Sequence, residues 1–178
     1  MARVPDTHDQ RIRRANPAGS ASLHTNDKEV PMDDITIYAA GEIHSEWRDD
    51  LRDHLEELGV DAELVGPQEV HERSDDIGED ILGEQPTARY RDLMGARVNT
   101  LRTRVLMQRA DMCVAYFGPK YKQWNTASDA GAAIASGLPL VLVRAEEHIH
   151  ALKELDALAT VTVETLEQAA EAIAYIFE

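Results

Sequence analysis

Polar and ionisable side chains follow four apolar segments of the chain, at the point where each segment ends. They are Glu42, His44 and Arg48; then His71, Arg73, Ser74 and Asp75; then Lys120, Lys122, Gln123, Trp124, Asn125 and Asp129; and finally Arg144, His148 and His150. Carboxylates in such a set can act as nucleophiles or carry protons, and the other side chains can bind a polar ligand. The set therefore indicates a small-molecule site assembled from several loops.

The loop from Lys120 to Asn125 is the most specific of these segments. It holds two of the four lysines of the chain, directly before a predicted helix whose free amide groups favour an anion. Trp124 could stack on a base or ring, and Gln123 and Asn125 could hydrogen-bond to its edge. The alternative is a packing tryptophan with solubilising lysines. The position of the loop at the expected ligand edge favours binding.

Asp129 lies one turn inside that predicted helix. Its neighbours are small, so the helix can approach a sheet closely. An acid near a helix start also stabilises the helix dipole. The residues alone therefore leave dipole stabilisation and catalysis equally open.

Several familiar kinds of site are excluded by spacing. No G-x-G-x-x-G follows the first strand, and no P-loop lysine motif is present. The histidines at the strand ends lack zinc-site spacing, and the acidic segment at 75–84 lacks the ligand spacing of a calcium loop. We expect no metal and no cofactor.

The charge of the chain is strongly acidic, with 33 acidic against 18 basic residues and a net charge of −15. Such a protein repels nucleic-acid backbones, so we expect no nucleic-acid partner. Only four of the basic residues are lysines. This composition favours a halophilic protein, whose self-repulsion is screened by salt, over an ordinary acidic protein.

Membrane and secretory signals are missing from the sequence. No apolar run approaches the roughly 18–20 residues of a membrane span. The basic residues near the start are not followed by the apolar segment of a secretory signal. The single cysteine, Cys113, lies in an apolar run, as a buried thiol in a reducing compartment would. We expect a cytoplasmic protein without membrane contact.

Five apolar segments alternate with helical patterns from residue 35 onward. Strands are predicted at 35–40, 62–65, 112–117, 139–143 and 161–163, and helices at 45–58, 96–109, 125–136, 149–158 and 165–177. Ser45, and Thr165 with Gln168, are the predicted helix caps. This order predicts an α/β fold, a doubly wound, Rossmann-like or flavodoxin-like, five-stranded parallel sheet with helices on both faces. In that class, ligands bind beyond the carboxyl ends of the strands.

Two segments fall outside this alternation. Residues 68–95 are polar and too long for a plain connection, which predicts a lid or binding loop. Residues 1–31 show no sustained period and are predicted to be a disordered extension. The predicted domain is therefore 32–178.

Six motifs within that domain carry a resemblance to a known family. They are AGEIHSEWR at 40–48, VGPQEVHERSDDIGE at 65–79, GEQP at 83–86, FGPKYKQWNTASDA at 117–130, LKELD at 152–156 and VETLEQA at 163–169. Together they resemble the YtoQ family, which is related to the nucleoside 2-deoxyribosyltransferases. The resemblance implies an enzyme that cleaves the N-glycosidic bond of a nucleoside or nucleotide and passes the sugar to another base. It also implies a homo-oligomer.

The resemblance further implies roles for particular residues. Asp129 falls where the family has its nucleophilic glutamate, Gln123 replaces an aspartate that contacts the base, and Asn99 replaces another active-site acid. A carboxylate there would trap the oxocarbenium-like sugar as a covalent glycosyl-enzyme. Glu42 or Asp75 could carry the proton to the leaving base. Because Asp129 is shorter than glutamate and two acids are replaced, a nucleoside N-glycosidase and a non-catalytic nucleotide-binding module stay open as alternatives.

Overall fold

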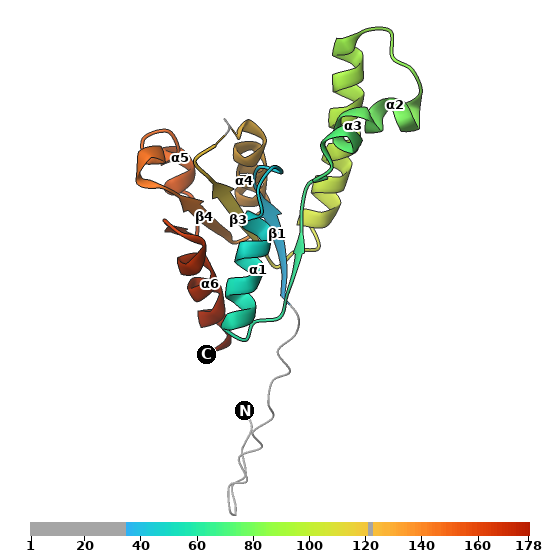
Figure 1. Cartoon of the computed structure of the whole chain (residues 1–178). Coiled ribbons are helices and arrows are strands. Elements are labelled where there is room, and N and C mark those ends of the chain that lie inside the picture. Colours follow the sequence, from blue (N-terminus) through green and yellow to red (C-terminus); the bar gives the residue numbers. More distant parts are fainter. Residues whose placement is uncertain (1–34, 121–122) are drawn as a thin grey trace, which may run out of the picture. The chain divides into compact units, whose positions relative to one another are not determined.

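The structure, a computed structural model, describes residues 35–120 and 123–178 (Figure 1). The predicted extension at 1–31 and the predicted site residue Lys122 lie outside the described residues.

Five parallel strands form one sheet, as the sequence predicts. They are β1 (Ile35–Ala40), β2 (Ala62–Val65), β3 (Met112–Phe117), β4 (Leu140–Arg144) and β5 (Val161–Val163), in the order β2-β1-β3-β4-β5. The order reverses between β1 and β3, and in such sheets the crevice at this reversal is where ligands bind. Both strands are buried along most of their length.

Helices cover both faces of the sheet. Helices α1 (Trp47–Glu57) and α6 (Leu166–Ala174) pack on the face that carries Ile37 and Ala39. The opposite face carries Tyr38 and Ala40 and packs against α4 (Trp124–Ser136), α5 (Lys153–Asp156) and the end of α3 (Ala88–Met107). Side chains of a strand alternate between its two faces, so Tyr38 points to the side where α4 lies.

The segment at 68–95 is helical, so the predicted loop is wrong. Helix α2 (His71–Leu82) and the first half of α3 form a helical hairpin in which α2 crosses α3, drawn in green in Figure 1. The two helices meet at Gly78 and Gly95, which are both buried. A Cβ atom on Gly78 would lie 2.4 Å from the backbone nitrogen of Gly95, so the contact requires glycine. Helix α3 therefore begins at residue 88, not at 96.

The helix ends differ from the prediction in detail. Thr165 caps α6 as predicted, because its hydroxyl oxygen accepts a hydrogen bond from the backbone N–H of Gln168 at 3.2 Å. Ser45 does not cap α1; the N-cap is Glu46, and the Ser45 hydroxyl donates to Glu42 instead. Of the helix predicted at 149–158 only the short α5 is formed, and the 3-10 turn η1 (Glu146–His148) precedes it; a further turn, η2 (Tyr175–Phe177), follows α6. Within the two described ranges, no helix has both the length and the apolarity to cross a bilayer.

Candidate functional site

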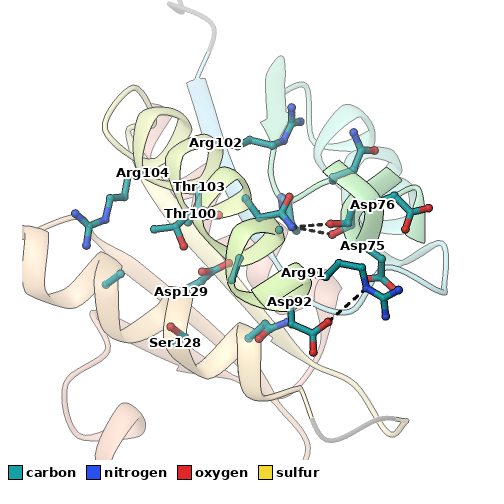
Figure 2. A pocket seen from close by; sticks show the side chains of 18 residues that line it. Asp75, Asp76, Arg91, Asp92, Thr100, Arg102, Thr103, Arg104, Ser128 and Asp129 are labelled. Carbon is teal, nitrogen blue, oxygen red and sulfur yellow. Dashed lines mark hydrogen bonds and ion pairs between the residues drawn. The ribbon is translucent and has the colours of Figure 1, made fainter. Parts of the chain in front are cut away.

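Two cavities lie at the carboxyl edge of the sheet and share a wall. The larger has a volume of about 600 Å³ and the smaller about 390 Å³. Their shared wall consists of Pro67, Gln68, Ser74, Asp75, Asn125 and Asp129. Asp129, from α4, thus faces both spaces. Figure 2 shows it in the larger cavity, opposite Thr100 and Thr103 of α3.

The carboxylate of Asp129 is held by a buried tyrosine. The Tyr38 hydroxyl donates a hydrogen bond to Oδ2 of Asp129 at 3.0 Å, and its oxygen lies 3.2 Å from Oγ1 of Thr103. A phenol has a single proton, so with that proton directed at Asp129 the Thr103 hydroxyl acts as donor to Tyr38. The chain of hydrogen bonds joins α3, β1 and α4 behind the Asp129 carboxylate.

Burial sets the protonation behaviour of this group. Desolvation raises the pKa of Asp129 above its ordinary value of 3.8, and the hydrogen bond from Tyr38 acts in the opposite direction. Burial, together with the charge of Asp129, also raises the pKa of Tyr38, which therefore remains a donor at any physiological pH. Cys113, on the neighbouring strand, is buried as predicted, and burial raises the pKa of its thiol to about 12. A perturbed carboxyl group in a cavity is a common property of catalytic acids and nucleophiles.

Glu42, the second predicted catalytic residue, lines the smaller cavity, but its carboxylate accepts hydrogen bonds from its own loop. One of its carboxylate oxygens accepts from the backbone N–H of His44 and the other from the hydroxyl of Ser45. Its backbone carbonyl accepts from the indole of Trp47 at 2.9 Å. Glu42 thus fixes the turn between β1 and α1 from inside.

Arg48 is buried beneath that turn and not in a cavity. Its guanidinium donates to the backbone carbonyls of Ala39 at 3.0 Å, Gly41 at 3.2 Å and Glu42 at 2.9 Å. It also lies 4.5 Å from the ring centroid of Trp47. Burial lowers the pKa of Arg48 from its ordinary value, and Glu69, 3.9 Å away, partly offsets this. The predicted substrate-binding side chain therefore holds the end of β1.

His71 and Asp75 are neighbours on the first turn of α2. Nδ1 of His71 lies 3.4 Å from Oδ2 of Asp75, and the ring of His44 meets the ring of His71 edge-on at 5.7 Å. All three line the smaller cavity, where Asp129 also lies. The structure thus brings together predicted residues from the β1–α1 turn, from α2 and from α4.

Asn99 holds the start of α2 in place. Its side-chain amide donates to the backbone oxygen of Ser74 at 2.9 Å and lies 3.2 Å from the Ser74 hydroxyl oxygen. Asn99 and Ser74 both line the larger cavity. Arg73, in contrast, pairs with Asp80 along α2 and lines neither cavity.

The loop before α4 differs from the predicted anion site. Trp124 lines the smaller cavity with 74% of its surface exposed, so its indole face is open to a ligand. The Gln123 amide donates to the backbone oxygens of Gly118 at 3.0 Å and Lys120 at 2.8 Å. Gln123 itself has φ 45°, in the left-handed region, and Asn125 lines both cavities. Lys120 is exposed and lines neither cavity.

The sequence patterns missed Tyr38 and Thr103. A tyrosine in an apolar strand indicates packing, although a buried phenol also needs a hydrogen-bond partner, which is the signal that was available. Arg91, Arg102 and Arg104 in the larger cavity were also missed, because they lie along helix α3 and do not follow a strand. Arg144, the last residue of β4, pairs with Asp156. Among the described residues, no group of three or more histidine, cysteine or acidic side chains could hold a metal ion.

Comparison with known proteins places this site in a family. The family model described as nucleoside 2-deoxyribosyltransferase YtoQ matches residues 38–177. The protein YtoQ of Bacillus subtilis strain 168, described as uncharacterized, is 50% identical over 145 residues, which are 82% of this chain and 98% of the relative.

Solved structures match at lower identity, and one of them shows the same fold. A conserved protein from Enterococcus faecalis V583 superposes with a TM-score of 0.52 at 21% identity, covering 81% of this chain and 99% of that one. A CMP N-glycosidase from Clostridium botulinum gives a TM-score of 0.45 at 17% identity, covering 79% of this chain and 98% of that one.

The family match extends from Tyr38 to beyond α6 and includes Asp129. The chain belongs to the YtoQ family of nucleoside 2-deoxyribosyltransferase-like proteins.

Proposed function

We propose that this protein is a glycosyltransferase that cleaves the N-glycosidic bond of a deoxynucleoside or its nucleotide, with Asp129 as nucleophile. The observation that carries the proposal is the placement of Asp129: a half-buried carboxylate, fixed by Tyr38 at 3.0 Å, on the wall between two cavities at the switch point of the sheet. The domain at 32–178 is the proposed catalytic unit.

The chemistry follows from the position of the carboxylate. Departure of the base leaves positive charge on the sugar, and an adjacent carboxylate stabilises that charge and then bonds to C1′. With Oδ2 of Asp129 fixed by the Tyr38 hydroxyl, Oδ1 is the proposed attacking atom. Partial burial strengthens this interaction, because water competes less for both charges. A second base then attacks C1′ and displaces the carboxylate.

The smaller cavity is the proposed place of the base. The exposed indole of Trp124 offers a stacking surface there, and Asn125 offers an amide at the boundary between the cavities. The sugar then lies over Asp129. The larger cavity, lined by Asp75, Asp76 and Asp92 and by Arg91 and Arg102, is the proposed place of the remaining hydroxyl or phosphate groups.

A homo-oligomer remains part of the proposal. Large apolar side chains are exposed on the α2–α3 hairpin, among them Ile81, Leu82, Tyr90, Leu93 and Leu101. Such side chains on a protein surface commonly mark contacts between chains. Light scattering across micromolar concentrations should give at least a dimer, and a monomer throughout would contradict this.

Base exchange is the direct test of function. We would incubate the protein with a deoxynucleoside and a second free base and separate the products by chromatography. Wild type should form the new nucleoside, and Asp129→Asn should reduce exchange roughly 10³-fold or more while retaining ligand binding. Asp53→Asn, an exposed acid on α1 outside both cavities, is the matched control and should react as wild type.

Either of two other results would contradict the transferase proposal and support a different function. Release of free base and free sugar without exchange would identify an N-glycosidase, with water as the acceptor. Binding of nucleosides without any base release would identify a binding module.

A further inference from the structure

We propose that His71, oriented by Asp75, donates the proton to the departing base and recovers it from the incoming acceptor. This assignment rests on the proposed glycosyl transfer at Asp129. It gives the acid–base role to a pair on α2 instead of to Glu42.

The geometry of the pair is that of an oriented imidazole. Nδ1 of His71 lies 3.4 Å from Oδ2 of Asp75, four residues further along the same helix. A carboxylate at Nδ1 fixes the tautomer and the direction of the ring, so Nε2 is the nitrogen that meets the ligand. His71 and Trp124 line the same cavity as Asp129, where the base is proposed to lie.

The exposure of the pair shows what Asp75 contributes. The side chains of His71 and Asp75 are 59% and 66% exposed, so their ion pair stabilises the fold very little. Asp75 instead contributes by orienting the imidazole ring of His71. A base stacked on Trp124 would cover both groups and strengthen their interaction by excluding water.

The backbone beneath the pair is fixed from α3. Asn99 donates to the backbone oxygen of Ser74 at 2.9 Å, within the first turn of α2. Three residues beyond Asp75, the buried contact between Gly78 and Gly95 brings the two helix backbones together. The position of His71 is therefore set by the hairpin, although its side chain is exposed.

Other charged groups near His71 are less suited to the step. Both carboxylate oxygens of Glu42 accept hydrogen bonds from the β1–α1 turn, through the His44 amide and the Ser45 hydroxyl. The ring of His44 packs edge-on against His71 from the same turn. Glu69 faces Arg48, and Glu72 is the exposed neighbour of His71 along α2. Of these groups, the His71–Asp75 pair combines a cavity position with an oriented donor.

The proposed step balances as follows. The bond between C1′ and the base nitrogen breaks, its electron pair goes to the base, and the proton on Nε2 of His71 moves to the base. At the same time a bond forms between C1′ and a carboxylate oxygen of Asp129. In the second half, the incoming base gives its proton to Nε2 and bonds to C1′, and the electron pair of the C1′–oxygen bond returns to Asp129.

A substrate whose leaving base needs no proton distinguishes proton donation by His71 from a role of His71 in substrate binding. We would compare a purine deoxynucleoside with its N7-methylated form, whose base is already cationic and departs neutral. His71→Gln should slow base release from the first substrate roughly 10²-fold, as expected for loss of an acid, and from the second only a few-fold. If the enzyme accepts only pyrimidines, we would compare deoxyuridine with 5-fluorodeoxyuridine, whose base is the better leaving group.

The controls distinguish this inference from the proposed function. Asp129→Asn should slow both substrates, and His54→Gln, at a partly exposed histidine of α1 outside both cavities, should slow neither. Equal losses on both substrates in His71→Gln, or no loss on either, would overturn the role of His71 while leaving Asp129 as nucleophile. If wild type released base from neither substrate, the proposed function itself would fail, and the role of His71 with it.

Discussion

The hydroxyl of Tyr38 lies 3.0 Å from Oδ2 of Asp129, joining the first strand to the helix that follows the third. The two residues are 91 positions apart, and the sheet order places their elements side by side. The hydrogen bond leaves one oxygen of Asp129 fixed and the other facing the cavities. It also sets how far burial raises the pKa of the carboxyl group.

Replacement of Tyr38 by phenylalanine should move the acid limb of the activity profile to higher pH. Burial raises the pKa of Asp129 and the Tyr38 hydrogen bond lowers it, so removing the donor raises that pKa further. Because the proposed nucleophile must be ionised to react, activity should then be lost at a higher pH on the acid side. We would measure kcat/KM from pH 4 to pH 8 for both proteins. An acid limb in the same place would contradict the link between the two residues.

Asp129→Asn should be more stable than wild type at pH 7. The folded-state pKa of Asp129 is raised above 3.8, so its contribution to stability is full below that value and is lost as pH rises through the folded pKa. Asparagine keeps the shape without the buried charge. The melting temperature of the variant should therefore exceed that of wild type at pH 7, with the difference shrinking toward pH 4. A variant that melts lower at both pH values would show that the charge stabilises the fold.

Arg48→Met should destabilise the fold rather than only weaken substrate binding. The substitution leaves the carbonyls of Ala39, Gly41 and Glu42 without their shared donor. The expected loss in unfolding free energy is roughly 3 kcal/mol, from urea denaturation. Arg52→Met is the control, because its ion pair with Asp49 is half-exposed and contributes about 1 kcal/mol at most. Equal effects of the two substitutions would contradict the structural role of Arg48.

Gly78→Ala should open the α2–α3 hairpin and move the first turn of α2. Its Cβ would lie 2.4 Å from the backbone nitrogen of Gly95, a contact that only backbone movement can relieve. We expect a loss of roughly 1–3 kcal/mol in stability. Gly131→Ala, on helix α4, meets no atom within 4 Å and should be neutral or stabilise by up to about 1 kcal/mol. Thermal unfolding of the two variants decides whether the close helix crossing is required.

The sheet could be predicted because its strands are short apolar runs bounded by glycine and proline. The strand at 112–117 ends before Gly118, and its predicted and observed bounds agree. The hairpin could not be predicted in this way. Helix α2 buries only Gly78, and most of α3 buries only Gly95, because glycine packs on glycine there. The larger apolar side chains of the two helices, such as Ile81, Tyr90 and Leu101, are exposed, so a buried apolar face does not mark this helix pair in the sequence.

The candidate site was predicted in outline from its position after the strands. Asp129, Asp75, His71 and Trp124 do line adjoining cavities, since the carboxyl ends of parallel strands meet at one edge. Arg48 could not be distinguished from its neighbours, because nothing in its spacing shows that it binds backbone carbonyls. The halophilic character and the oligomeric state stay predictions.

The most direct test of Asp129 as nucleophile is the mass of a trapped intermediate. A nucleoside with fluorine at C2′ and a good leaving base slows breakdown of the glycosyl-enzyme more than its formation, because fluorine destabilises the charged sugar. After incubation, intact-protein mass spectrometry should show one added fluorosugar, and peptide mapping should place it on Asp129. Asp129→Asn should show none. An adduct on another residue, or wild-type base exchange with no adduct at any time, would contradict the account.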